Sequence, residues 1–192
     1  MLEALSDIWD ISEASFPATG QPAGQLRFLL QYAILAPSTH NTQPWLFKIR
    51  GDALELYADR SRALPVVDPA SRALTISCGA ALFHLRIALR HFGYKSMVET
   101  FLNPIDKDWL ARVYVGERWQ TTAEEHLLFQ AIPKRRTNRQ AFDIQQVPET
   151  LLAVLRNAAA EEGSWFDIVQ GEETRNMLGH LIAEGKPQAM DG

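Results

Sequence analysis

The segment 35–47, LAPSTHNTQPWLF, gathers short polar side chains between two prolines. Ser38, His40, Asn41 and Gln43 offer hydroxyl, imidazole and amide groups, all of which can donate and accept hydrogen bonds. Such a set is suited to recognising the edge of a flat heterocycle. It is equally suited to a capped turn, in which the serine and the asparagine bond their own backbone. The pattern of residue types leaves both interpretations open.

Two other kinds of chemistry are disfavoured in this segment. A metal site would need carboxylates or thiols beside His40, and the segment contains neither. A nucleophilic pair of Ser38 and His40 would need a third orienting residue and a glycine elbow around the serine, and neither is evident. We therefore expect recognition or structure from this loop.

A second candidate is the basic stretch 134–139, KRRTNR. Arginine guanidinium groups bind phosphate oxygens through paired hydrogen bonds, and Thr137 adds a hydroxyl. The alternative is a solvated charged turn, because exposed charges of this kind usually contribute little. Single histidines elsewhere, and Cys78 inside an apolar run, are more typical of packing than of ligation or reactivity.

The composition is that of an ordinary globular protein. The chain has 192 residues, of which 46% are hydrophobic, and a net charge of −4, so it lacks the basic excess typical of proteins that bind nucleic acid or an anionic membrane. A single cysteine excludes an internal disulfide and fits a reducing compartment. The acidic N-terminus does not resemble a signal peptide, and no apolar run reaches the roughly 20 residues of a membrane span. We expect a cytoplasmic protein with no nucleic acid or membrane partner.

Hydrophobic periodicity and turn residues predict the elements that position these segments. Helices are expected at 26–36, 71–92, 121–132, 149–161 and 172–184, a hairpin at 45–58, and strands at 94–102, 111–116 and 164–169. Thr122 and Glu125 are spaced as a capping box, and Gly93 is placed to end the second helix. The small residues 77–81 in that helix would let another backbone pack closely. The predicted class is α+β, with an antiparallel-rich sheet covered by long helices.

A weak internal duplication is also expected. Helix 26–36, its loop and strand 45–50 correspond in order to helix 149–161, a short loop and strand 164–169. The second copy keeps only EEGS where the first has PSTHNTQP. One copy is therefore specialised and the other is not.

These segments carry a resemblance to a known family. APSTHNTQPW resembles the A-P-S-x-x-N-x-Q-P-W signature of the FMN-dependent nitroreductases, and RRTNRQAF resembles their R-R-S-x-R-x-F signature, with a slightly longer spacing before Phe142. The order of the two motifs is similar to that of the Acg-like branch, in which two nitroreductase-like halves are fused in one chain. The resemblance covers about residues 26–185.

The resemblance implies a division of the chain into parts. Residues 1–25 would be an N-terminal extension, 26–132 a first nitroreductase-like half, 133–185 the start of an incomplete second half, and 186–192 a loose tail. An incomplete half would leave apolar surface exposed, which favours a homodimer or association through that half. The chain would then be the N-terminal portion of a fused protein.

The resemblance also implies a composite FMN site. The family's flavin lies where the two motifs from different halves meet, so both motifs in this chain would serve one site. The residues at the matching positions are Pro37, Ser38 and Asn41 toward the ring, and Arg135, Thr137 and Arg139 toward the phosphate and ribityl chain. No metal is expected.

The function implied is hydride transfer from NAD(P)H through FMN to a small-molecule electron acceptor, a nitro compound or a quinone. The flavin carries this chemistry, so the protein needs no catalytic acid–base pair of its own. The alternative is a flavin-binding or sequestering protein, or an inactive fragment without reductase turnover.

Overall fold

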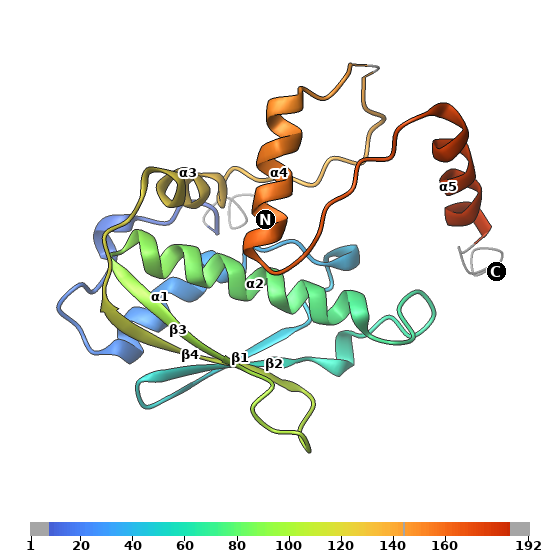
Figure 1. Cartoon of the computed structure of the whole chain (residues 1–192). Helices are drawn as coiled ribbons and strands as arrows, with labels where there is room; N and C mark the ends of the chain where they lie inside the picture. The colour runs from blue at the N-terminus through green and yellow to red at the C-terminus, as the bar shows by residue number, and fades with distance from the viewer. Residues whose placement is uncertain (1–7, 144, 185–192) are drawn as a thin grey trace, which may run out of the picture. The chain divides into compact units, whose positions relative to one another are not determined.

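The computed structural model describes residues 8–143 and 145–184. The chain divides into two compact units, one ending at Thr137 and one beginning at Asn138, and each is described by itself. Residues 186–192, the expected tail, lie outside the described residues. Both units are drawn in Figure 1.

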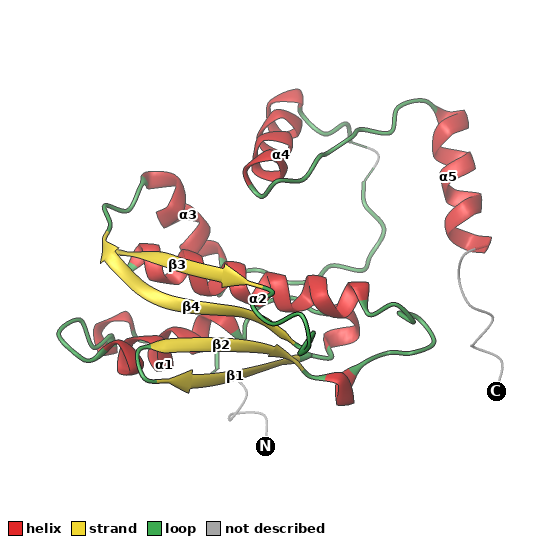
Figure 2. Ribbon diagram, turned by 60° about the horizontal axis from the view of Figure 1, so that its bottom comes forward, coloured by secondary structure: helices red, strands yellow, loops and turns green. Residues whose placement is uncertain are grey.

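The first unit is built on a four-stranded antiparallel sheet. Its strands are β1 (Trp45–Arg50), β2 (Ala53–Ala58), β3 (Tyr94–Thr100) and β4 (Trp109–Arg118), in the order β1-β2-β4-β3 (Figure 2). Trp45 pairs with Ala58 and Arg50 with Ala53, so the predicted hairpin is confirmed. Gly51 in its two-residue turn has a φ of 59°, which a residue without a Cβ adopts at least cost.

Long helices cover one face of this sheet. They are α1 (Pro22–Ala33) and α2 (Arg72–His91), while α3 (Ala123–Ala131) packs against α2. The core between them is made of fully buried leucine and valine side chains, Leu26, Leu29, Leu54, Leu85, Leu89 and Val113. The α+β class and the antiparallel sheet under long helices are therefore confirmed.

Helix boundaries follow local chemistry. α3 begins with the predicted capping box, because the Thr122 hydroxyl accepts from the Glu125 backbone and the Glu125 carboxylate accepts from the Thr122 backbone. The predicted start of the first helix at residue 26 is wrong, since α1 begins at Pro22. Proline suits the first helical position, where a backbone N–H has no partner within the helix.

Helix α2 is long and apolar enough to cross a membrane, by length and composition alone. Half of its most apolar stretch is, however, buried inside the first unit. This burial against the sheet and α1 is what a core helix of a folded domain shows, and it explains the apolar composition without a membrane.

The opposite face of the sheet carries a buried carboxylate. Glu55 on β2 is 2% exposed and accepts hydrogen bonds from Arg112 at 2.7 Å, Tyr57 at 3.0 Å and Arg50 at 3.2 Å. Burial raises the pKa of Glu55, but these hydrogen bonds outweigh it and hold the pKa below its usual value. The ionised carboxylate thus ties β1, β2 and β4 together.

The second unit contains α4 (Glu149–Glu161) and α5 (Glu172–Glu184), as predicted. The predicted strand at 164–169 is wrong, because this segment is extended but pairs with no other strand among the described residues. A β-strand needs a neighbour to satisfy its backbone N–H and C=O groups. The proposed duplication and the boundaries 26–132 and 133–185 stay predictions, although the compact units divide five residues later than expected.

Apolar side chains of these two helices remain exposed. On α4 the exposed set is Leu151, Val154 and Leu155, and on α5 it is Met177, Leu178, Leu181 and Ile182. Neither helix buries a residue. The expected exposure of apolar surface in this part of the chain is therefore observed, and the association that it would favour stays a prediction.

The Glu55 cluster predicts how stability depends on pH. A carboxyl group whose pKa is lower in the folded than in the unfolded state stabilises the fold above the unfolded pKa, about 4.3, and this contribution is lost as the pH falls through the folded value. Glu55→Gln should lower the free energy of unfolding by about 1.5–3 kcal/mol at pH 7, and by progressively less below pH 4.3. Urea unfolding at a series of pH values measures this difference.

Glu99→Gln is the matched control, because Glu99 on β3 is exposed. It should change the free energy of unfolding little at any pH. Equal effects of the two substitutions at pH 7 would contradict the assigned role of Glu55.

Candidate functional site

The polar loop has a defined and strained conformation. His40, Asn41 and Gln43 adopt positive φ values of 51°, 57° and 49° around the short helical turn Thr39–Asn41. Residues other than glycine adopt this region at a cost, so the surrounding contacts must maintain it. One such contact is internal, since the Ser38 hydroxyl oxygen accepts from the Gln43 backbone at 2.9 Å.

The loop is fixed to α2 through small residues of that helix. The Thr39 backbone donates to the Ser77 hydroxyl at 3.2 Å, and the Cys78 thiol donates to the Pro44 carbonyl at 3.1 Å. The predicted close approach of a backbone to residues 77–81 is confirmed by these bonds. Cys78 is fully buried, and burial raises its pKa to about 12, so it packs as a neutral thiol.

A third anchor comes from the polar segment after β2. Arg62 donates to the Thr42 carbonyl at 3.1 Å, and the Asp59 backbone donates to the Pro44 carbonyl at 2.9 Å. Neither residue was predicted from the sequence to hold the loop, because a backbone carbonyl can be reached by any donor that the fold brings near.

The predicted ring-binding residues differ in exposure. Ser38 is half-buried and its oxygen is engaged by Gln43, as the capped-turn interpretation expected for the serine. Pro37 and Asn41 are exposed. The loop therefore holds its own shape through Ser38 and presents Pro37 and Asn41 at its surface.

Arg135 lies beside this loop. Its guanidinium donates to the Leu35 carbonyl at 3.3 Å and to the Thr137 hydroxyl at 3.2 Å. The structure thus brings the first part of the arginine motif to the residues that precede Pro37, within one compact unit. Arg139 is exposed and belongs to the second unit.

The donor set at Arg135 suits an anionic, oxygen-rich ligand such as the phosphate of FMN. The Nε atom of Arg135 is buried and has no hydrogen-bond acceptor among the described residues. A buried charged donor without an acceptor is costly, and a phosphate oxygen would satisfy it. The residues present therefore fit the group that the sequence resemblance implies.

Metal-ligating side chains and a buried histidine are the remaining candidates for chemistry among the described residues. Residues 8–143 and 145–184 contain no group of three or more metal-ligating side chains that could hold a metal ion. His84 is buried with its Nδ1 atom 3.3 Å from the Tyr32 carbonyl, and burial lowers its pKa, so it packs as a neutral ring.

No protein-family model matches the chain. A Mycobacterium tuberculosis protein named "Putative NAD(P)H nitroreductase" is 38% identical over 168 residues, which cover 84% of this chain and 48% of that protein. The protein named "Putative NAD(P)H nitroreductase acg", from the same organism, is 34% identical over 126 residues, covering 66% of this chain and 38% of that protein. The "Probable NAD(P)H nitroreductase PigM" of Serratia is 30% identical over 179 residues, covering 82% of this chain and 45% of that protein.

A solved structure of a nitroreductase family protein from Streptococcus pneumoniae is 17% identical, with a TM-score of 0.40, and covers 66% of this chain and 86% of that chain. The sequence identities to the three relatives above, and not this structural similarity, show the family. The chain spans about half the length of the curated relatives that it matches. Over that span it is a member of the nitroreductase family, with Acg among its relatives.

Proposed function

We propose that this chain supplies the loop and the arginine motif of an FMN site in an NAD(P)H-dependent oxidoreductase. The observation that carries the proposal is the hydrogen bond from Arg135 to the Leu35 carbonyl. It links the first residue of the arginine motif to Leu35 at the start of the loop segment, 100 residues earlier in the sequence and within the same compact unit. The relatives named as NAD(P)H nitroreductases support the reaction class.

Each residue has a distinct part in this proposal. Arg135 and Thr137 hold the FMN phosphate through charge-assisted and hydroxyl hydrogen bonds, and Arg139 adds a further cation. Ser38 and Asn41 face the edge of the flavin ring, and Pro37 restricts the backbone that leads to them. Lys134 and Arg136 add positive charge to the same stretch, which favours an anionic cofactor in a chain of net charge −4.

The anchored loop lowers the loss of conformational entropy on cofactor binding. Its strained backbone is already held by Ser77, Cys78 and Arg62, so little conformational freedom remains to be lost when a ligand arrives. When bound, FMN supplies hydride transfer from NAD(P)H to a nitro compound or a quinone. The protein's own residues bind the cofactor and orient it.

Arg135→Ala is expected to weaken FMN binding. Loss of a charge-assisted hydrogen bond corresponds to about 1.5–3 kcal/mol, or roughly 10- to 150-fold in the dissociation constant. Quenching of FMN fluorescence on titration with the full chain measures it. Arg27→Ala is the matched control, because Arg27 is an exposed arginine on α1.

The FMN-site proposal fails if the wild-type chain is colourless and does not quench added FMN. It fails equally if Arg135→Ala and Arg27→Ala bind FMN with the same affinity. Thermal unfolding of both variants separates lost binding from lost folding.

Turnover is tested on the flavin-loaded chain under anaerobic conditions. NADH or NADPH should bleach the flavin absorption, and a nitroarene or a quinone should restore it. Bound FMN that neither nicotinamide reduces would assign the chain to flavin binding without reductase turnover. This result would leave the binding site in place and remove the proposed reaction.

The anchoring of the loop gives a separate prediction. Ser77→Ala removes the acceptor for the Thr39 backbone, which should lower the free energy of unfolding by about 1 kcal/mol and weaken FMN binding several-fold. Thr75→Ala is the control, because the Thr75 hydroxyl bonds the Ser71 carbonyl on the same helix. If Ser77→Ala loses stability but binds FMN as the control does, the loop does not position the cofactor.

A further inference from the structure

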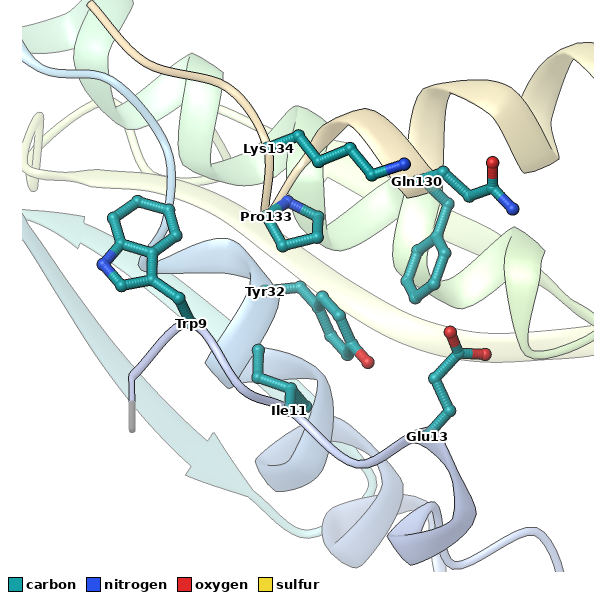
Figure 3. A pocket seen from close by; sticks show the side chains of 8 residues that line it. Trp9, Ile11, Glu13, Tyr32, Gln130, Pro133 and Lys134 are labelled. Atoms are coloured by element: carbon teal, nitrogen blue, oxygen red, sulfur yellow. The ribbon is translucent and has the colours of Figure 1, made fainter. Parts of the chain in front are cut away.

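The first unit contains a cavity that no residue of the 37–44 loop lines. It has a volume of about 210 Å³ and lies between the N-terminal segment, α1, α3 and the residues after α3 (Figure 3). Its apolar wall is formed by Trp9, Ile11, Phe129 and Pro133, and Glu13, Tyr32, Gln130 and Lys134 add polar groups. Of these residues only Lys134 has a part in the proposed FMN site, as an added positive charge.

The aromatic side chains of the cavity wall are held in place by contacts with neighbouring side chains. The Arg136 guanidinium lies 4.2 Å from the centre of the Trp9 ring. Phe129 stacks on His91 with ring centres 3.6 Å apart and contacts Tyr32 at 4.8 Å. Flat rings fixed in this way offer a preformed surface to another flat ring.

Tyr32 places an unused hydrogen-bond donor at this cavity. The residue is 2% exposed, and its hydroxyl has no hydrogen-bond partner among the described residues. Burial, with a smaller effect of the Glu13 charge, raises the pKa of Tyr32 to about 12, so the hydroxyl keeps its proton. A buried donor without an acceptor costs free energy that a ligand oxygen would restore.

Glu13 provides an acceptor at the same end of the cavity (Figure 3). Its carboxylate is 2.8 Å from His91 Nε2, and since a carboxylate can only accept, that nitrogen carries the proton. His91 Nδ1 lies 3.4 Å from His126 Nδ1, and His126 Nε2 lies 2.9 Å from the Gln130 amide nitrogen. These contacts connect Glu13 to Gln130 through the two histidine rings.

This chain of bonds fixes two polar groups of the cavity wall, Glu13 at one end and Gln130 at the other. One carboxylate oxygen of Glu13 is used by His91 and the other is left for a ligand. The Glu13 side chain is 57% exposed, so it forms the rim over which a ligand would enter.

We propose that this cavity binds a small, neutral, monocyclic phenol. The phenolic hydroxyl accepts a hydrogen bond from Tyr32 and donates one to Glu13, and the ring lies among Trp9, Ile11 and Phe129. An apolar cavity of about 150 Å³ in another protein holds benzene, so about 210 Å³ accommodates a substituted benzene ring. The Glu13 charge disfavours an aromatic carboxylate at the Tyr32 hydroxyl, whereas Lys134, which also lines the cavity, carries the opposite charge.

The test uses the full chain and p-cresol as the probe, with toluene and 4-methylbenzoate for comparison. Chemical shifts of backbone amides, followed on titration, report both affinity and location without any flavin. We expect p-cresol to bind at millimolar concentration or below, to shift the amides of residues 9–13 and 129–134, and to bind more tightly than toluene or 4-methylbenzoate.

Tyr32→Phe removes only the unpartnered hydroxyl, so the variant should fold. It should weaken p-cresol binding about 3- to 10-fold and leave toluene binding unchanged. Tyr114→Phe, on the opposite face of the sheet, is the matched control and should leave both unchanged. Absence of p-cresol binding, shifts confined to other residues, or equal p-cresol affinity in Tyr32→Phe and Tyr114→Phe would each overturn the proposal.

Discussion

The burial of α2 is the constraint on which the first unit depends. One side of this helix packs leucines and alanines against the sheet and α1, and it must do so along nearly all of its length. At one turn, however, the buried positions are Ser77 and Cys78. Small side chains there leave room for the backbone of the 37–44 loop, and their polar atoms bond that backbone. The hydrophobic core and the shape of the loop are therefore set by the same helix.

This arrangement explains how strained residues persist in the loop. Three non-glycine residues with positive φ are unfavourable by themselves, and together they would favour another conformation. Hydrogen bonds with Ser77, Cys78 and Arg62 satisfy backbone groups of the loop in the observed conformation. The strain is thus balanced by contacts to elements that the core already fixes, and the loop gains rigidity without a glycine.

Elements governed by local chemistry were predictable from the sequence. The Gly51–Asp52 turn, the Thr122–Glu125 capping box and the periodicity of 71–92 each depend on residues close in the chain. The structure of residues 164–169 was not predictable in this way. Their residue types favour a strand, but a strand also requires a neighbouring strand. The role of Arg62 and the cavity at Tyr32 depend on residues brought together from distant segments, and one sequence carries no signal for them.

Each of the two proposed sites contains a buried side-chain donor without an acceptor. The described residues include four such donors, and two of them, Arg90 Nε and Trp109 Nε1, lie at neither site. The other two are Arg135 Nε beside the loop and the Tyr32 hydroxyl at the cavity. Folded proteins satisfy nearly all buried polar groups, so in both proposals the ligand supplies an acceptor that a buried donor lacks. The two ligands must differ, because the first donor is a cation suited to phosphate and the second is a neutral hydroxyl beside a carboxylate.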